Sequence, residues 1–417
     1  MGDRSSSPGP DGPLLALVGS GDRRYREYIL AALAPHFRLW LLDAIEPSWH
    51  RPYLTGFTLV DTHDPAALVG AVRRIGSEVA PVAGLFSYDE WVIDATAIAV
   101  EQLGLPGSPP QAVAACRDKA ATRRILAGHG VDQPRSVAVT GQVEAVEAAA
   151  SIGYPVVVKA RRLAGSIGVQ RVEDEQGLVP AYRAADAVVF PGVVRDGADV
   201  LVEEYLDGPE ISVDSAVVDG NVIPLALARK QTGLAPYFEE TVHLIDGADP
   251  LLADEALNDQ LHRIHSGLGL TDGMTHTEFR LTRDGPRLIE INARLSGDFI
   301  PYLGELATGV DFAVAAGQVA TGCYSTSRPT RRRVAGIRFL YPPVDCRILD
   351  LRVRTDLLGP EVHAAVATGQ PGQDLALPPR GFLSRYGYVI AVADSVEQTN
   401  AELERAHDII ELEYKPI

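Results

Sequence analysis

The composition is that of a globular protein with room for two or three domains. The chain has 417 residues, of which 46% are hydrophobic and 22% are charged, and this length is enough to bury substantial cores. Its formal net charge of −17 argues against nucleic acid or an anionic membrane as the main partner. No apolar run approaches the roughly 18 residues that a membrane-spanning helix needs.

The N-terminus and the cysteines favour a reducing, cytoplasmic location. Residues 1–12 are polar and rich in Pro, Gly and Ser, so we expect a disordered tail; they lack the basic-then-apolar order of a secretion signal. Cys116, Cys323 and Cys346 are odd in number and far apart. They fit neither a disulfide framework nor a zinc site, and we expect each to be a buried thiol.

Strands and helices alternate in the first region of the chain, residues 13–110. LLALVGSG predicts a buried strand that ends in a glycine turn, and YREYILAALAPHF predicts the helix after it. RLWLLDA and PVAGLFSYDE predict two more strands, with a helix from PAALVGAVRRIG between them. This order implies an α/β fold with a parallel open sheet covered by helices. The GSG turn lacks the full dinucleotide-binding fingerprint, so it is a weak nucleotide signal.

Two further regions follow the Pro/Gly-rich boundary GLPGSPPQA. The second begins with AVAACRDKAATRRILAGHG, which predicts one helix that stops at a glycine. YPVVVKA predicts a strand ending in Lys159, RRLAGSIGVQRV a glycine-containing loop, and VLVEEYLDGPEISVDSAVVDG a strand, a turn and a strand. The third region contains RYGYVIAVADSVEQTNAELERAHDIIELEY, which predicts a strand and a closing helix.

The segment HTEFRLTRDGPRLIEINARLSG, residues 276–297, predicts a β-hairpin. Polar and apolar residues alternate on both sides of an Asp-Gly turn. With the turn as centre, Glu278 lies opposite Glu290 and His276 lies opposite Asn292. Because side chains repeat every second residue along a strand, Glu278, Glu290, Asn292 and Arg294 share one face.

Two facing carboxylates repel each other, so a cation is expected beside them. Oxygen ligands of this kind suit Mg²⁺, which proteins commonly bind through one or two carboxylates together with substrate phosphates. The alternative is a surface hairpin whose glutamates pair with Arg280 or Arg287.

Upstream of the hairpin lie features suited to phosphate. Only four of the 38 basic Lys and Arg residues are lysine, and two of them, Lys119 and Lys159, could place ammonium groups on phosphates. The loop AGSIGVQ, with Ser166 and Gly168, could cap phosphates with backbone N–H groups. It is not a Walker loop, because Gly-Lys-Ser/Thr occurs nowhere in the chain.

The segment VEEYLDGPE offers groups to the rest of a nucleotide. Glu203, Glu204 and Leu206, with nearby backbone groups, could meet an adenine edge, and Glu210 could reach ribose hydroxyls.

In this order and character, Lys119, Lys159, AGSIGVQ, VEEYLDGPE and TEF…IEINAR resemble the ATP-grasp superfamily over roughly residues 112–320. The spacing of the hairpin residues is similar to that of biotin carboxylase. THTEFRL, INARLSGDFIPYL and the C-terminal tail look most like the L-amino acid ligases that make dipeptides, of the bacilysin-pathway type. The resemblance implies a pre-ATP-grasp domain at 13–110, an ATP-grasp domain of two α+β subdomains at 111–325 with a lid at about 120–200, and a small C-terminal α+β region at 330–417.

The resemblance also implies an ADP-forming ligase that uses ATP and Mg²⁺, with Mn²⁺ as an alternative. A carboxylate would attack the γ-phosphorus of ATP, and an amine would then displace phosphate from the acyl phosphate. Glu278, Glu290 and Asn292 would hold metal, Lys159 and Arg294 would act in catalysis, and the loop 164–170 would close over ATP.

The substrates implied are a carboxylic acid and an amine, both expected to be amino acids, and a homodimer is expected. Residues that border the expected substrate pocket are Arg229, Lys230, Glu240, His243, His276 and Asp298, with Tyr88, Asp89 and Glu90 lining it from the first domain. Alternatives that stay open are a carrier-protein thiol or another amine as acceptor, a biotin carboxylase-like enzyme, and a nucleotide-binding relative without catalysis.

Overall fold

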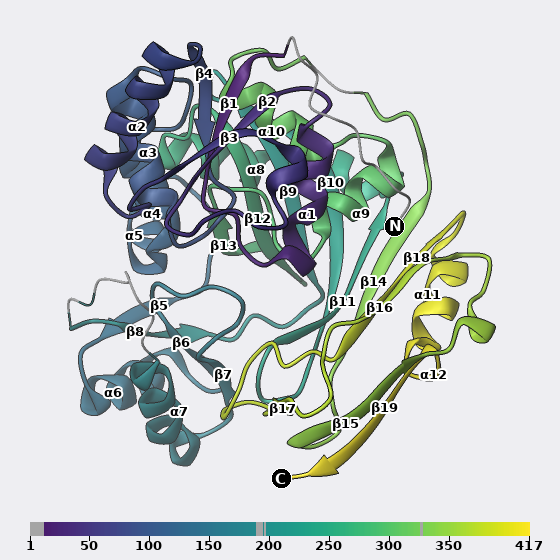
Figure 1. Cartoon of the computed structure of the whole chain (residues 1–417). Helices are drawn as coiled ribbons and strands as arrows, with labels where there is room; N and C mark the ends of the chain where they lie inside the picture. The colour runs from purple at the N-terminus through teal and green to yellow at the C-terminus, as the bar shows by residue number, and fades with distance from the viewer. Residues whose placement is uncertain (1–11, 189–194, 196, 326–327) are drawn as a thin grey trace.

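The N-terminal sheet is parallel, as predicted, and has the strand order β3-β2-β1-β4 (Figure 1). The computed structural model describes residues 12–188, 195, 197–325 and 328–417; the predicted disordered tail lies outside them up to residue 11. Asp22 and Asp64 begin two of the helices, because their carboxylates accept the first free N–H groups. The elements are β1 (Leu14–Val18), α1 (Arg23–Leu33), β2 (Arg38–Asp43), η1 (Arg51–Tyr53), β3 (Leu54–Leu59), α2 (Pro65–Glu78), β4 (Val82–Phe86) and α3 (Ile93–Leu103).

The single helix predicted for residues 112–130 is wrong. The chain forms α4 (Pro110–Arg117) and α5 (Lys119–Leu126), with Asp118 extended between them at φ −103° and ψ 96°. The carboxylate of Asp118 accepts hydrogen bonds from the N–H groups of Ala120 and Ala121, so it caps the second helix. The apolar periodicity runs through this break and hides it. As a result, Lys119 is the first residue of α5.

A small antiparallel sheet with two helices on one face lies at the bottom of Figure 1; it overlaps the span expected to be a lid, and we call it the lid. Its strand order is β5-β8-β6-β7. Val156 and Val158 pack against the helices, and the alternate residues, Val157 and Lys159, face the rest of the molecule. The elements are β5 (Ser136–Val139), α6 (Gln142–Ile152), β6 (Val156–Ala160), β7 (Val169–Val172), α7 (Glu175–Ala187) and β8 (Val200–Glu204).

An antiparallel sheet of eight strands forms the centre, in the order β13-β12-β9-β10-β11-β14-β18-β16. Leu257, Leu261 and Ile264 of α8 pack on one face, and α9 and α10 cover the other. The elements are β9 (Glu210–Val218), β10 (Asn221–Gly233), β11 (Glu239–Asp246), η2 (Pro250–Ala253), α8 (Glu255–Leu268), β12 (Gly273–Thr282), β13 (Gly285–Asn292), α9 (Ile300–Thr308) and α10 (Phe312–Ala320).

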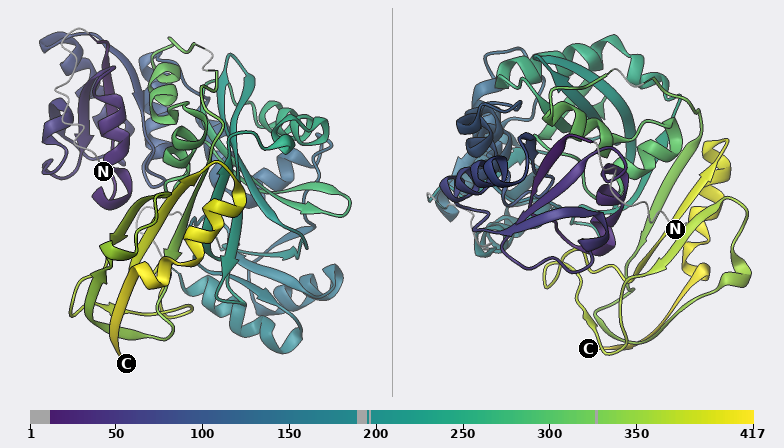
Figure 2. Two further views of the ribbon diagram at one scale, coloured as in Figure 1. Left: turned by 90° about the vertical axis from the view of Figure 1, so that its right-hand side faces the viewer. Right: turned by 45° about the horizontal axis from the view of Figure 1, so that its top comes forward.

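The C-terminal region shares this sheet, since β14 pairs with β11 from Val242 to Asp246. In Figure 2 the yellow and light-green strands run on from the teal strands. A second layer is the three-stranded sheet β17-β15-β19. The elements are β14 (Val334–Leu340), β15 (Cys346–Val353), η3 (Thr355–Leu357), β16 (Val362–Ala367), β17 (Asp374–Leu375), β18 (Gly387–Ala393), α11 (Val396–Glu404), α12 (Ala406–Ile409) and β19 (Ile410–Pro416).

The cysteines follow the prediction in part. Cys116 and Cys346 are buried free thiols, whereas Cys323 is exposed. The expectation was wrong for Cys323 because it lies in the surface turn that follows α10. Among the described residues, no helix combines the length and the apolarity that crossing a bilayer requires.

Candidate active site

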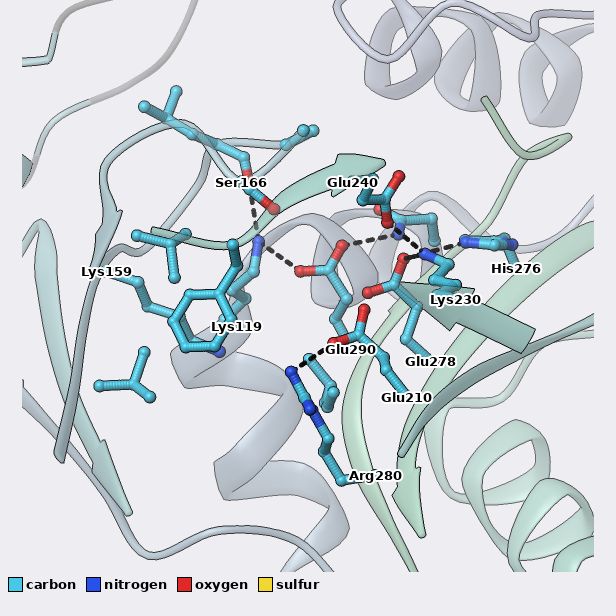
Figure 3. Close-up of a pocket in the computed structure, with 18 of the residues that line it drawn as sticks. Lys119, Lys159, Ser166, Glu210, Lys230, Glu240, His276, Glu278, Arg280 and Glu290 are labelled. Carbon is cyan, nitrogen blue, oxygen red and sulfur yellow. Dashed lines mark hydrogen bonds and ion pairs between the residues drawn. The ribbon is translucent and has the colours of Figure 1, made fainter. Parts of the chain in front are cut away.

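A cavity that is partly open to solvent lies between the lid and the central sheet (Figure 3). Most residues predicted from the sequence line it: Lys119, Lys159, Ser166, Glu203, Glu204, Leu206, Glu210, Lys230, Glu240, His276, Glu278, Glu290, Asn292, Arg294 and Asp298. Three predicted residues are not part of the cavity lining: Gly168, Arg229 and His243.

The predicted hairpin register is confirmed. Glu278 pairs with Glu290 and His276 pairs with Asn292 across β12 and β13. Lysines offset the repulsion between the carboxylates. The Nζ atom of Lys119 lies 2.9 Å from Oε2 of Glu290, and the Nζ atom of Lys230 lies 2.6 Å from Oε1 of Glu278. In this structure, ammonium groups occupy the positions beside both carboxylates.

The alternative of a surface hairpin does not hold. The side chain of Arg280 binds Glu210 at 2.7 Å, and that of Arg287 binds Glu204 at 3.1 Å. Neither arginine pairs with Glu278 or Glu290. Burial raises the pKa of Glu210 to about 7 although Lys230 and Arg280 oppose it.

Polar neighbours on the same strands orient the facing carboxylates. Nδ2 of Asn292 donates a hydrogen bond to Oε1 of Glu290 at 3.0 Å. His276 lies between Asp214, at 3.2 Å, and Glu278, at 3.0 Å. Burial lowers the pKa of His276, but Asp214 and the two hydrogen bonds raise it by more, to about 9. The protonated ring therefore donates to both carboxylates.

At the lid end, Glu203 is held in a buried ion-pair cluster. Lys159 Nζ lies 2.5 Å from its Oε2 and Arg123 Nε lies 2.9 Å from its Oε1. Burial opposes ionisation, yet Arg123 and Lys159 lower the pKa of Glu203 to about 2. The carboxylate of Glu203 is ion-paired with both basic residues, so the backbone of this segment offers the groups without such a partner for contact with adenine.

The glycine loop is built from left-handed backbone. Gly165, Ser166 and Gly168 have φ values of 66°, 56° and 72°. Ser166 faces the cavity. Gly168 does not face the cavity, and a Cβ added to it would point at Val188 and Ala160 of the lid. Its positive φ is a conformation that glycine adopts without strain.

Hydrogen bonds to residues outside the cavity fix the side chain of Arg294. Its Nε donates to Oε2 of Glu90 and its Nη1 donates to the carbonyl oxygen of Leu295 at 2.8 Å. Tyr88, Asp89 and Glu90 were expected to line the pocket, but they lie outside its wall. The hydroxyl of Tyr88 donates to the Ser20 carbonyl instead. The first domain therefore acts on the cavity through Glu90 and Arg294.

The far end of the cavity contains Glu240, whose Oε1 lies 2.6 Å from Lys230 and whose Oε2 lies 3.3 Å from Nε2 of His243. His243 is fully buried behind it. Arg229 was predicted here, and that was wrong: it lies on the opposite face of β10, since neighbouring residues of a strand alternate, and it pairs with Asp249 at 2.7 Å.

Sequence reasoning missed Arg123, Leu383 and Arg385. Arg123 follows Lys119 by four residues on one helical face, which is a signal that could have found it. Leu383 lines the cavity and Arg385 lies behind its wall. They are more than 85 residues from the hairpin, and no local pattern marks them.

Comparison with known proteins agrees with this arrangement. Residues 152–301 match the family model described as an ATP-grasp domain. The chain is 30% identical to the uncharacterized protein y4rH of Sinorhizobium fredii, over 86% of this chain and 73% of that protein. The chain belongs to the ATP-grasp superfamily. The family resemblance inferred from its residues is thereby confirmed, and with it the assignment to the ligases.

Other relatives of this ATP-grasp enzyme have named activities. Alanine–anticapsin ligase of Bacillus subtilis is 30% identical over 58% of this chain, and human carnosine synthase 1 is 29% identical over 61%. The chain spans 56% and 32% of those two proteins. The crystal structure of an L-amino acid ligase from Bacillus licheniformis superposes with a TM-score of 0.79 at 24% identity, covering 97% of this chain and 99% of that one. This shows a shared fold.

Proposed function

We propose that this ATP-grasp enzyme is a carboxylate–amine ligase that joins two amino acids and releases ADP and phosphate. The observation that carries the proposal is the pair Glu278 and Glu290, which face each other in a cavity with three lysines. Named relatives that make alanine–anticapsin and carnosine support the choice of amino acids.

The residues of the hairpin fit a divalent cation. The Oε2 atom of Glu278 and the amide oxygen of Asn292 receive no hydrogen bond among the contacts of the described residues, and Glu290 adds a third oxygen donor. An all-oxygen set suits Mg²⁺, and Mn²⁺ as an alternative. A bound cation would supply neutralisation of the triphosphate. These three residues would hold it.

Basic residues around the cation would bind the rest of ATP. Lys119 and Lys159 point toward the space below the glycine loop (Figure 3), where their ammonium groups would pair with phosphates. Ser166 would donate to a phosphate oxygen and the loop would exclude water from the acyl phosphate. Backbone groups of Glu204–Leu206 would meet the adenine, and Glu210 the ribose.

The reaction would run in two balanced steps. An oxygen of the acid's carboxylate attacks the γ-phosphorus, and ADP leaves. The nitrogen of the amine then attacks the acyl carbon, loses a proton, and expels phosphate. Arg294, held in place by Glu90, would orient the acid's carboxylate and then the phosphate. Lys230, Glu240, His243, His276 and Asp298 surround the end of the cavity that would take the acid.

The test is phosphate release from ATP and Mg²⁺ across a matrix of amino acid pairs, with mass spectrometry of the products. We expect ADP, phosphate and a product that is one water lighter than the two amino acids together. Formation of AMP, or absence of an amide product in the presence of bound ATP, would contradict the proposal.

Two further expectations belong to this proposal. We propose a homodimer, supported by a structural neighbour described as a biotin carboxylase domain dimer, and light scattering after size exclusion tests it. We also propose a cytoplasmic enzyme, supported by three free cysteines.

A further inference from the structure

The C-terminal region contributes a buried arginine to the wall of the cavity. Arg385 precedes β18, and its Nη2 lies 2.7 Å from Oδ2 of Asp298, which lines the cavity. Only 3% of the Arg385 side chain is exposed, against 24% for Asp298. The guanidinium therefore lies behind the carboxylate, outside the lining of the cavity.

Aromatic neighbours fix the guanidinium from its other sides. It lies over the ring of Phe339, 3.7 Å from the centroid. Its Nε donates to the hydroxyl oxygen of Tyr341 at 2.9 Å, and that hydroxyl donates to Glu239 at 2.7 Å. The planar guanidinium is stacked on Phe339 and hydrogen-bonded to Tyr341 and Asp298, so it cannot turn toward a substrate. Its role is therefore to fix Asp298.

The backbone at Asp298 shows that its position is specified. Asp298 and Phe299 are consecutive residues with φ of 52° and 64°. Residues without glycine's freedom rarely occupy this region, and strain of this kind gathers at functional sites. Beside them, a Cβ added to Gly297 would meet nothing within 4 Å. The segment holds the Asp298 carboxylate at the edge of open space.

We propose that Arg385 is a specificity-determining residue, which neutralises Asp298 so that the cavity accepts an acid substrate with an uncharged or acidic side chain and rejects a cationic one. The inference rests on the proposed ligase function. Glu240, the other carboxylate at this end, is paired with Lys230 at 2.6 Å. Both Glu240 and Asp298 therefore already have a cationic partner, and a cationic substrate side chain would be placed beside Lys230 and Arg385, which is unfavourable in a buried site.

The same pairing controls binding of a free cation. Glu240, His243 and Asp298 each offer a ligand atom, and the three atoms lie within 4.8 Å of one another. Without Arg385, the carboxylate of Asp298 would lose its ion-pair partner. Its oxygen, which lies close to the imidazole of His243, could then bind a cation. We therefore expect this cluster to bind a divalent cation more tightly when Arg385 is removed.

The first test replaces Arg385 by Met and traps the acyl phosphate with hydroxylamine, so that the identity of the amine acceptor does not matter. Nitrogen attacks the acyl carbon, phosphate leaves, and a hydroxamate forms. With leucine, glutamate and lysine as acids, we expect the ratio of kcat/KM for lysine to that for leucine to rise by about tenfold or more in Arg385→Met. The double variant Arg385→Met/Asp298→Asn should lose this gain.

The matched control is Arg347→Met, which removes an exposed arginine paired with Asp374 in the C-terminal sheet. Its acid preference should equal that of the wild type. An unchanged lysine-to-leucine ratio in a folded Arg385→Met protein would overturn the proposal, because a purely structural arginine would lower both values alike.

A second test needs no turnover and uses Co²⁺ alone as the probe. Arg385→Met should gain a visible Co²⁺ absorption that the additional change His243→Ala removes. If the gain is absent, Asp298 is not masked by Arg385 and the proposal fails. If hydroxamate forms from no acid in the wild type while the Co²⁺ result holds, the ligase proposal fails and the masking stands.

Discussion

Replacement of Glu290 by Gln removes one charge from the hairpin and leaves the shape of the side chain. The ion pair with Lys119 spans 2.9 Å, which corresponds to about 6 kcal/mol of Coulomb attraction at an effective dielectric constant of about 20. This gross attraction is not the net loss. Lys119 keeps its hydrogen bond to the carbonyl of Leu163 at 2.6 Å, and the repulsion from Glu278 across the hairpin disappears.

We therefore expect a modest change in folding and a large change in activity. The free energy of unfolding should fall by about 1–3 kcal/mol. Burial raises the pKa of Glu290, but Lys119, the hydrogen bond from Asn292 and Lys159 together lower it by more, so the group is a carboxylate at neutral pH. Gln cannot replace that charge beside a metal and a triphosphate, and turnover of ATP should fall by about 100-fold to 1000-fold.

The assay couples ADP formation to NADH oxidation at saturating ATP and Mg²⁺, with denaturant unfolding of the same preparations. Asp284→Asn is the control, because Asp284 lies at the exposed tip of the same hairpin. It should match the wild type in both measurements. A folded Glu290→Gln protein that turns over ATP as fast as the wild type would refute a metal role for this hairpin.

Three further predictions concern other parts of the molecule. Lys230→Met should reduce turnover by about 100-fold. Arg229→Met changes the neighbouring residue on the opposite face of β10, and its turnover should stay within about twofold of the wild type. Equal effects of the two changes in steady-state assays would contradict the assigned faces. Gly208→Ala should weaken ATP binding and lower the melting temperature, because its φ of 138° and the Leu281 carbonyl leave no room for Cβ; calorimetry showing unchanged affinity would count against it. His265 is buried and bonded to Thr275, and burial lowers its pKa from 6.5 to about 4. Its contribution to stability is present above pH 6.5 and is lost as the pH falls toward 4, by roughly 3 kcal/mol. In urea unfolding, the free energy of unfolding of His265→Gln should fall less between pH 6.5 and 4 than that of the wild type. The exposed His262→Gln should behave like the wild type. Parallel pH curves for the wild type and both variants would contradict this role of His265.

The sequence alone predicted the structure correctly where the physical signal lies in neighbouring residues. Alternation around an Asp-Gly turn predicted the pairing of Glu278 with Glu290, and the order of strands and helices predicted the parallel N-terminal sheet. The break at Asp118 was missed because helical periodicity continues across it. Arg229 was misplaced because its face depends on the register of β10, which the residues around it do not determine.

What could not be predicted depends on contacts between distant segments. The carboxylate of Glu203 forms its ion pairs with Arg123 from α5 and Lys159 from β6. The partner of Asp298 comes from the start of β18, after the sheet has crossed from the central domain into the C-terminal region. Charge pairing across 87 positions of the chain leaves no periodic signature, so these roles appear only once the fold is known.

The distribution of lysine has a practical consequence for chemical labelling. Three of the four lysines line the cavity with side chains between 1% and 9% exposed, and the fourth, Lys415, is exposed in β19 of the outer C-terminal sheet. Among the lysines, amine-reactive dyes or resins should therefore attach first at Lys415. The enzyme can be tethered to a surface through its last strand with the cavity lysines unmodified.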